Sequence, residues 1–422
     1  MSTTKRSTAS MAYSPHSTEE DGGCPVEILD RIFAFVDNHS LTNVALASRT
    51  FYGVSCRIIY RHIPSLPLPR TVLCLRTLAT NPDLANFART YEVGSMDTLD
   101  ADRATFLMAP FYHLLIRAVH NMPHIVELQF LLDDPTSFIL TGAPFRLTKL
   151  TTTCNFDPTF AAWLEEQPTL HRIHVYGPFI SGTTLRPDAL PEPHRISSSP
   201  LVLACVIPGR QVRDVELCLV QPWLLNREVI GTLVQVMSYA DRPLESFQLI
   251  GHLTEPADVV ISALKPIPAG LQSLSHLSLN AISGSITSHF LADFPSIISK
   301  FISLKSITLI SKNKYDALHD HMITRTLASS WHAKCPSLQR LSLPYATWLQ
   351  SRDHGWVTIE QLQRILAEKE RTLMERERRV IQREAMLREN QRRLEMQERD
   401  LIRKVETISV ANVDTKYNGV VQ

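Results

Sequence analysis

A short apolar motif recurs through the middle of the chain and constrains the fold more than any other feature. Its template is apolar-x-x-apolar-x-apolar, and from residue 125 onward successive copies begin 22 to 42 residues apart. Repeats of about 20–45 residues that each carry one short strand are typical of solenoids. The clear copies are Ile125/Leu128/Phe130, Leu170/Ile173/Val175, Val212/Val215/Leu217, Leu244/Phe247/Leu249, Leu274/Leu277/Leu279, Leu304/Ile307/Leu309 and Leu338/Leu341/Leu343, and weaker copies lie at Leu147/Leu150 and Ala88/Tyr91/Val93.

The segments between these copies are expected to be helices. They lie at residues 104–121, 158–167, 226–240 and 317–334, and several stop at a proline just before the next strand, as at Pro123, Pro168, Pro243 and Pro336. The longest spacing holds the Pro/Ser-rich stretch Gly177 to Pro200, which we interpret as a loop insertion.

One face of the predicted sheet should be exposed to solvent. Side chains alternate along a strand. The residues that flank the middle apolar position are all polar in the seven clear copies and in the weaker copy at Leu147/Leu150. A sheet covered on both faces would be apolar on both. A solvated face and a binding face both remain open; because the charges are mixed, no ligand of a single sign is indicated. The candidate target-binding residues on this face are Arg172, His174, Asp214, Glu216, Gln248, His276 and Arg340.

A small helical module is predicted before the repeats. Residues 1–23 are polar and Ser/Thr-rich, so we expect a disordered tail. Pro25 then opens an apolar helix, a turn ends at the N-cap candidate Ser40, and two further helices carry the chain to about residue 63. Such a small core often completes its apolar surface against a partner, although a plain helical cap on the next domain is the alternative.

The same residues resemble an F-box. The resemblance covers residues 24–36 (CPVEILDRIFAFV), 41–49 (LTNVALASR), Phe51-Tyr52 and residues 58–61 (IIYR). Two positions depart from the family pattern: Cys24 replaces a leucine and Phe51 a tryptophan. The resemblance implies docking on the Skp adaptor and, through it, on a cullin–RING ubiquitin ligase. Carried over by position, the docking residues are Pro25, Ile28, Leu29, Ile32, Val44, Ala45, Phe51 and Tyr60.

The repeats resemble the irregular leucine-rich repeats that follow F-boxes in many receptor proteins. The Asn/Cys position after the Leu-x-Leu stretch is not regularly present, so the repeats would be degenerate. The resemblance implies an α/β fold with parallel strands and return helices, and a doubly wound α/β domain is the competing architecture.

The C-terminal segment predicts one long helix. From Ile359 to Ile408 every seventh residue is apolar, and no Pro or Gly interrupts the run. A standard coiled coil has two apolar positions per heptad, and here the second is mostly polar. A weak coiled coil and a solitary helix stabilised by its own charge pairs both fit. The candidate self-association residues are Leu366, Leu373, Val380, Leu387, Leu394 and Leu401.

Composition and the absence of known catalytic motifs argue against several classes of function. The net charge is +1, and residues 359–408 interleave 13 basic with 11 acidic residues, which argues against binding to nucleic acid or membrane. The seven cysteines are scattered, and neither a secretory signal nor a membrane span is recognised, so we expect an intracellular protein of the cytoplasm or nucleus. Phosphate-loop, nucleophile-elbow and zinc-protease motifs are absent. His319, His321, His171 and His174 are better explained as surface histidines than as metal ligands.

These observations lead to a non-catalytic receptor that uses no cofactor or metal. The expected parts are a tail at 1–23, an F-box-like module at 24–63, a degenerate leucine-rich-repeat domain at 64–350, a heptad helix at 357–408 and a disordered tail at 409–422. The expected function is that of a substrate receptor in a Skp–cullin–F-box ubiquitin ligase. The rival hypothesis is a scaffolding protein without any link to ubiquitin.

Overall fold

The structure is a computed structural model that describes residues 24–94, 109–132, 136–219, 225–284, 286–312 and 316–417, with side chains of the last helix described to residue 405. The chain divides into two compact units, Met1–Tyr315 and Asp316–Gln422. The tail expected at residues 1–23 lies outside the described residues, as do residues 104–108 of the helix expected at 104–121.

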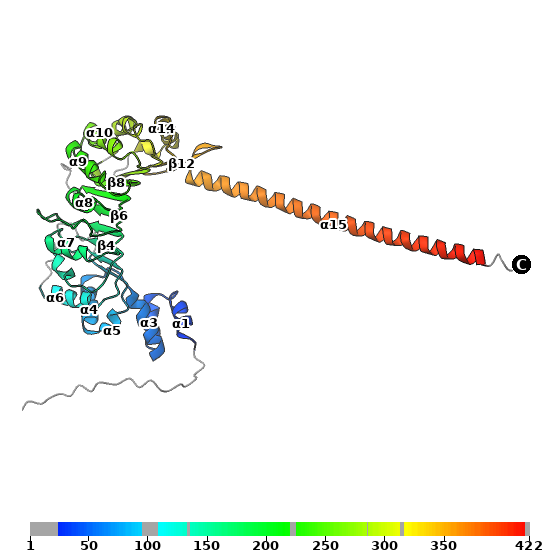
Figure 1. Ribbon diagram of the computed structural model, residues 1–422, viewed down its shortest axis with the longest axis horizontal. Helices are drawn as coiled ribbons and strands as arrows, with labels where there is room; N and C mark the ends of the chain where they lie inside the picture. Colours follow the sequence, from blue (N-terminus) through cyan, green and yellow to red (C-terminus); the bar gives the residue numbers. More distant parts are fainter. Residues whose placement is uncertain are drawn as a thin grey trace, which may run out of the picture. The chain divides into compact units, whose positions relative to one another are not determined.

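The first unit begins with three helices and continues as alternating strands and helices (Figure 1). Its elements are α1 (Val26–Phe33), α2 (Asn38–Val44), α3 (Arg49–Arg61), β1 (His62–Ile63), α4 (Leu68–Thr80), α5 (Pro82–Ala85), β2 (Thr90–Val93), α6 (Ala109–His120), β3 (Glu127–Phe130), η3 (Ser137–Leu140), β4 (Lys149–Thr152), α7 (Pro158–Glu165), β5 (Arg172–Val175), β6 (Arg195–Ser198), α8 (Pro200–Val206), β7 (Asp214–Leu219), α9 (Arg227–Met237), β8 (Ser246–Leu253), α10 (Ala257–Leu264), α11 (Pro266–Gly270), β9 (His276–Gly284), α12 (Ser288–Asp293), α13 (Pro295–Ile298) and β10 (Ser306–Ser311).

The three-helix module α1–α3 has its own small core. Leu29 and Phe33 of α1 pack with Leu41 of α2 and Val54 of α3. The side chain of Asp37 caps α2 by accepting hydrogen bonds from the backbone N–H groups of His39 and Ser40. The N-cap is therefore Asp37 and not Ser40 as predicted, because a carboxylate three residues earlier already satisfies the free amides of the first turn.

The strands of the first unit form a parallel sheet in which spatial order follows chain order, from β1 to β10. Each expected copy of the motif within this unit coincides with one strand, including the two weaker copies at β2 and β4. The register places the middle apolar residues of these copies, together with Ile196 of β6, side by side in one buried row, which is Tyr91, Leu128, Leu150, Ile173, Ile196, Val215, Phe247, Leu277 and Ile307.

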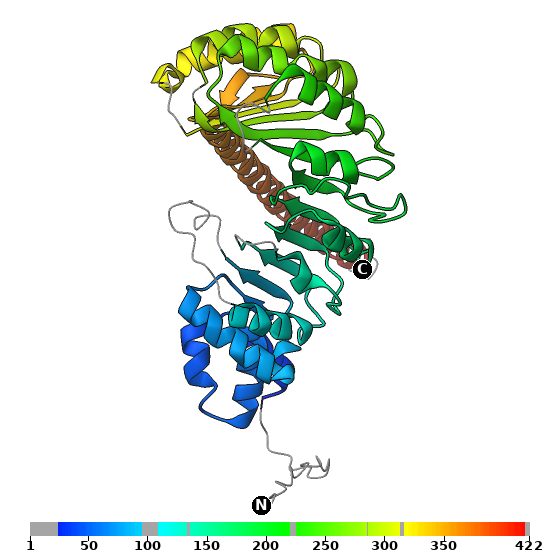
Figure 2. The same cartoon turned by 90° about the vertical axis from the view of Figure 1, so that its left-hand side faces the viewer.

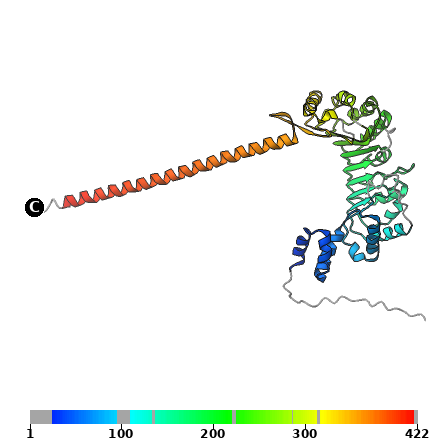
Figure 3. The same cartoon turned by 180° about the vertical axis from the view of Figure 1, so that it is seen from behind.

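The helices of this unit cover one face of the sheet. Figure 1 shows α6, α7, α8 and α9 on the same side of β4, β6 and β8, and Figure 3 shows the strands from behind. Consecutive helices also pack on one another, as α8 does on α9 and α9 on α10 (Figure 2). The apolar row therefore points into the helical layer, and the opposite face stays open, as the polar flanking residues predict.

The loop insertion expected from Gly177 to Pro200 is wrong in part. The stretch contains β6, which pairs with both β5 and β7. This strand keeps only Ile196 of the apolar template. Its other inward position is Ser198, whose hydroxyl donates to the carbonyl of Val175 at 2.6 Å. Backbone pairing on both sides and a satisfied hydroxyl thus replace the missing apolar side chain.

The second unit differs from the repeats before it. Its elements are η5 (Asp316–His319), α14 (His321–Lys334), β11 (Arg340–Ser342), β12 (Thr347–Ser351), β13 (Gly355–Thr358) and α15 (Ile359–Tyr417). The last copy of the motif forms β11, which pairs with β12 in antiparallel orientation, and β12 pairs likewise with β13. The hairpin β12–β13 was not predicted and crosses the expected domain boundary at residue 350.

Helix α15 is longer than expected. It begins at Ile359 and ends at Tyr417, nine residues beyond the predicted end at residue 408. The reason is that neither proline nor glycine occurs between residue 408 and Gly419. The last five residues, 418–422, lie outside the described residues. None of the described helices is both long enough and apolar enough to span a lipid bilayer.

Candidate functional site

Helix α1 carries two apolar rows, and only one of them is used inside the protein. Leu29 and Phe33 are buried in the module core. Ile28 and Ile32 of α1 and Phe35 in the turn just after the helix follow each other at i, i+4 and i+7 and are exposed by 44, 51 and 92%. A single exposed apolar residue is ordinary, whereas a row at helical spacing marks a surface that a partner can cover. We call these three residues the α1 row.

The predicted docking residues separate into three groups. Pro25, Ile28 and Ile32 are exposed, as docking requires. Leu29 is instead a core residue. The remaining four, which are half-buried, are Val44, Ala45, Phe51 and Tyr60.

Packing accounts for the partial burial of two of these four, Val44 and Phe51. Val44 and Phe51 pack against the module core, and the ring of Phe51 meets that of Phe33 edge-on, with centroids 5.4 Å apart. Tyr60 is half-buried, and this burial, together with the Cys74 thiol of α4, raises its pKa. Sequence reasoning left out Phe35 and Leu46, which are exposed by 92 and 84%. The i, i+7 spacing from Ile28 could have identified Phe35.

The open face of the sheet presents two rows of polar side chains in register. The first row crosses neighbouring strands, and so does the second, two residues further along each strand. Charge on this face extends from β2, where Glu92 lies beside Gln129, to β7, and the part from β8 to β10 carries Ser, Gln, His and Thr. The rows are Glu127, Lys149, Arg172, Arg195, Asp214, Ser246, His276 and Ser306, and Gln129, Thr151, His174, Ser197, Glu216, Gln248, Ser278 and Thr308.

Glu216 does not act as a free residue of this face. It is 7% exposed and accepts hydrogen bonds from Arg195 at 3.1 Å and from Ser197 at 2.6 Å. Both partners stand on β6, the strand that the sequence did not reveal. Next to them, burial lowers the pKa of His174, whose ring lies 3.5 Å from the Tyr176 hydroxyl. His174 is therefore neutral at physiological pH.

Arg172 is an available cation among the predicted target-binding residues. It is exposed, and within the described part of the chain no carboxylate forms an ion pair with it. Its neighbour Lys149, in contrast, pairs with Glu127 at 3.4 Å. Asp214 and Gln248 are half-buried on the same face, and His276 is exposed. Arg340 is exposed on β11, which belongs to the second unit.

The histidines that could have bound metal have other contacts. His171 stacks on His194, with ring centroids 5.3 Å apart. His319 stacks on Tyr345, and His321 meets Trp348 edge-on. Across the described residues, no group of three or more His, Cys, Asp or Glu side chains could hold a metal ion.

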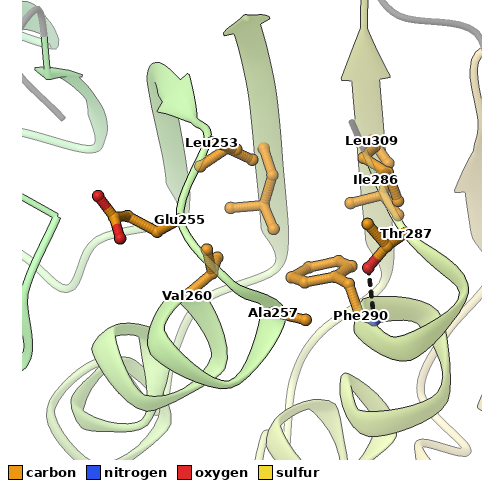
Figure 4. A pocket seen from close by; sticks show the side chains of 9 residues that line it. Leu253, Glu255, Ala257, Val260, Ile286, Thr287, Phe290 and Leu309 are labelled. Carbon is orange, nitrogen blue, oxygen red and sulfur yellow. Dashed lines mark hydrogen bonds between the residues drawn. The ribbon is translucent and has the colours of Figure 1, made fainter. Parts of the chain in front are cut away.

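A small apolar cavity lies under the ends of β8 and β9. It measures about 20 Å³ and is lined by Leu253, Val260, Ile286 and Phe290, among others (Figure 4). This volume holds about one water molecule. The cavity is therefore a packing defect and not a ligand site.

The apolar stripe of α15 is uncovered from Leu366 to Leu401. The six residues predicted to mediate self-association are exposed by 56 to 65%, and they are Leu366, Leu373, Val380, Leu387, Leu394 and Leu401. The helix contacts β12 and β13, and Lys369 pairs with Asp353 in the turn between them; from residue 370 to residue 405 every side chain of the helix is exposed.

Comparison with known proteins gives little. No protein-family model matches the chain, and no curated protein matches it. Among solved structures, the chain is similar to the yeast complex of Rad7 and Elc1, with 10% sequence identity, a TM-score of 0.32 and coverage of 75% of this chain and 85% of that one. Because the score is low, this likeness assigns neither fold nor function. A functional assignment therefore depends on this chain's own residues.

Proposed function

We propose that this protein is the substrate receptor of a Skp–cullin–F-box ubiquitin ligase and performs no catalysis itself. In this proposal α1–α3 are the F-box, and the sheet of the first unit with its helices is a solenoid of degenerate leucine-rich repeats. The observation that carries the proposal is the α1 row, since Ile28, Ile32 and Phe35 leave an apolar surface uncovered on a module whose sequence resembles an F-box.

The surface has the properties that docking on another protein requires. An interface core is apolar and free of charge, with polar residues at its rim. The α1 row supplies three large apolar side chains, and the acidic Glu27 and basic Arg31 are exposed on the same helix. The helix is held from behind by Leu29 and Phe33, so binding orders no new structure and loses little conformational entropy.

The repeats support the receptor part of the proposal. The strands of the sheet present polar side chains on the face that the helices leave open, and this produces a continuous polar surface with charges of both signs in its first part, up to β7. Repeat proteins bind other proteins on such surfaces. A target bound there would be held near the enzyme that carries ubiquitin, and the resulting effective concentration is the source of rate enhancement.

The connection between the two parts favours this mechanism. Helix α3 ends at Arg61 and β1 begins at His62, with no residue between them. The module also contacts α5 through α3. An adaptor bound at the module would therefore stand at a defined position relative to a target bound on the sheet.

The experiment is a binding assay of the full chain with purified Skp adaptor. The test variant is Ile28→Asp/Ile32→Asp, which places two charges on the α1 row and leaves the core intact. The control is Ile302→Asp, because Ile302 is 72% exposed and lies far along the chain, just before β10. We expect wild type and control to bind equally and the test variant to lose at least 100-fold in affinity, since charge in an apolar interface core is left without partners.

Leu29 must not be altered in this test, because Leu29→Asp would unfold the module and abolish binding for a trivial reason. If wild type fails to bind, or if Ile28→Asp/Ile32→Asp binds as wild type does, the receptor hypothesis is wrong. The scaffolding hypothesis then becomes the better explanation of the repeats and of α15.

A further inference from the structure

The stripe of α15 is flanked by charges of opposite sign on its two sides. The residues three positions after each stripe residue are basic or neutral, and those four positions after are mostly acidic. The basic row is Lys369, Arg376, Arg383, Asn390, Gln397 and Lys404, and the acidic row is Glu370, Glu377, Glu384, Gln391, Glu398 and Val405.

Helix geometry puts these rows on either side of the stripe. In a helix with a seven-residue repeat, a step of three residues turns about 50° one way from the starting side chain and a step of four about 50° the other way. The two rows therefore border the stripe along its length. All of these side chains are exposed where they are described.

Packing two copies stripe to stripe gives different results in the two orientations. In a parallel pair, the two-fold axis runs along the helices, and the basic row of each copy faces the acidic row of the other. In an antiparallel pair, the two-fold axis is perpendicular to the helices, and each row faces the same row of the other copy. Parallel packing thus brings opposite charges together on both sides, whereas antiparallel packing brings like charges together.

We propose that α15 binds a second copy of this chain in parallel and in register through the stripe from Leu366 to Leu401. Arg376 of each copy then lies opposite Glu377 of the other, and Arg383 opposite Glu384. The axial offset within each pair is one residue, or about 1.5 Å, which a salt bridge accommodates. This inference does not depend on adaptor binding.

Contacts within one chain do not compete strongly with this arrangement. Lys369 lies 3.4 Å from Asp353 in the turn between β12 and β13, and Glu384 lies 3.8 Å from Arg388 of the next turn. All four side chains are more than half exposed. Pairs this exposed contribute little, so the rows stay available. No described residue of the chain covers the stripe itself, which leaves another helix as its partner.

The first test is the mass of the full chain in solution, by sedimentation equilibrium at low and high salt. We expect a dimer that weakens as salt is added, because the flanking pairs are attractive and screened. Glu377→Lys/Glu384→Lys places lysines opposite Arg376 and Arg383 of the other copy and should weaken dimerisation at least tenfold. Adding Arg376→Glu/Arg383→Glu exchanges the rows and should restore it.

The matched control is Glu375→Lys/Glu389→Lys, which changes charge equally on the opposite side of the helix and should leave the dimer intact. A wild type that is monomeric at on the order of 100 µM would overturn the proposal, even if the stripe binds another protein. The proposal would also be overturned if Glu377→Lys/Glu384→Lys left the dimer unchanged, or if salt strengthened the dimer.

Orientation is tested by disulfide cross-linking of the full chain with Cys24→Ser, because Cys24 is an exposed thiol. Leu373→Cys alone and Leu394→Cys alone should each cross-link to a second copy of themselves if the pair is parallel. In a fully overlapped antiparallel pair, residue 373 of one copy meets residue 394 of the other, so only a mixture of the two variants would cross-link. That result would overturn the parallel arrangement.

Discussion

Replacing Arg210 by methionine tests what holds the stretch before β6 and the end of α8 to the body of the first unit. Arg210 lies between α8 and β7, is only 3% exposed and has no carboxylate in an ion pair with it among the described residues. Its guanidinium donates to five backbone carbonyls, at 2.7 Å for Arg186, 2.8 Å for Ala189, 3.0 Å for Pro208, 3.1 Å for Val206 and 3.4 Å for Cys205. Burial lowers its pKa, but an arginine remains charged at neutral pH.

The expected loss of stability is set by these bonds. The four bonds of 3.1 Å or less each contribute about 1.5–3 kcal/mol, because the donor is charged. Burial of an ion costs several kcal/mol, and this cost disappears in the variant. Methionine keeps the aliphatic packing of the stem. We therefore expect Arg210→Met to lower the free energy of unfolding by about 3–5 kcal/mol.

Native-state hydrogen exchange is the appropriate assay, because it reads β6 and β7 separately from the second unit. The opening free energy of amides in residues 195–219 should fall by the same amount as the free energy of unfolding. The control is Arg213→Met, since Arg213 is half-exposed and its nearest carboxylate, Glu245, is 3.8 Å away. It should change that free energy by less than about 0.5 kcal/mol. If Arg210→Met stays within about 1 kcal/mol of wild type, the five bonds do not anchor the stretch.

Three further changes probe other parts of the first unit. Val260→Ile adds one methyl group beside the 20 Å³ cavity of Figure 4 and should raise the free energy of unfolding, measured by urea denaturation, by up to about 0.8 kcal/mol. A lower free energy of unfolding would show that the cavity cannot admit the added group. Tyr91→Phe should stabilise by about 1 kcal/mol in the same assay, because the buried Tyr91 hydroxyl has no hydrogen-bond partner among the described residues; a loss would reveal a partner. Burial raises the pKa of the Cys218 thiol from 9.0 to about 11, so folding favours the protonated thiol. The stability that this preference adds is fully present below pH 9. Stability should therefore fall as pH rises from 9 toward 11, and Cys218→Ala should make the urea midpoint fall less over that window; equal slopes would contradict this.

The sheet could be predicted from sequence wherever the apolar template is complete. Strand β6 escaped because Ser198 stands at an inward position and its hydroxyl is satisfied by a carbonyl of the neighbouring strand, a contact that only the folded chain creates. Because β6 was not recognised, the burial of Glu216 could not be predicted either. The alternation of side chains along β7 correctly places Glu216 on the open face. It is nevertheless buried, because Arg195 and Ser197 of the unrecognised strand surround it.

The candidate docking surface was only half predictable. Helix α1 is apolar on two adjacent rows, and the 3.6-residue period fits both equally well. Which row becomes core depends on where α3 packs, and the contact between Phe33 and Phe51 decides it. The stripe of α15 presents the opposite case. Its seven-residue spacing is visible in the sequence, and the fold adds only that no described residue of the chain covers it.

The agreement between spatial order and chain order in β1–β10 has a consequence for how the protein is made. Each strand of this sheet hydrogen-bonds only to the strands directly before and after it along the chain. As the chain leaves the ribosome, the partner of every new strand has already been synthesised, so the sheet can grow one strand at a time behind the exit tunnel. Loop closure then involves only a few tens of residues at each step. A chain interrupted partway would leave a shorter sheet with one unfinished edge, and not a core with its centre missing.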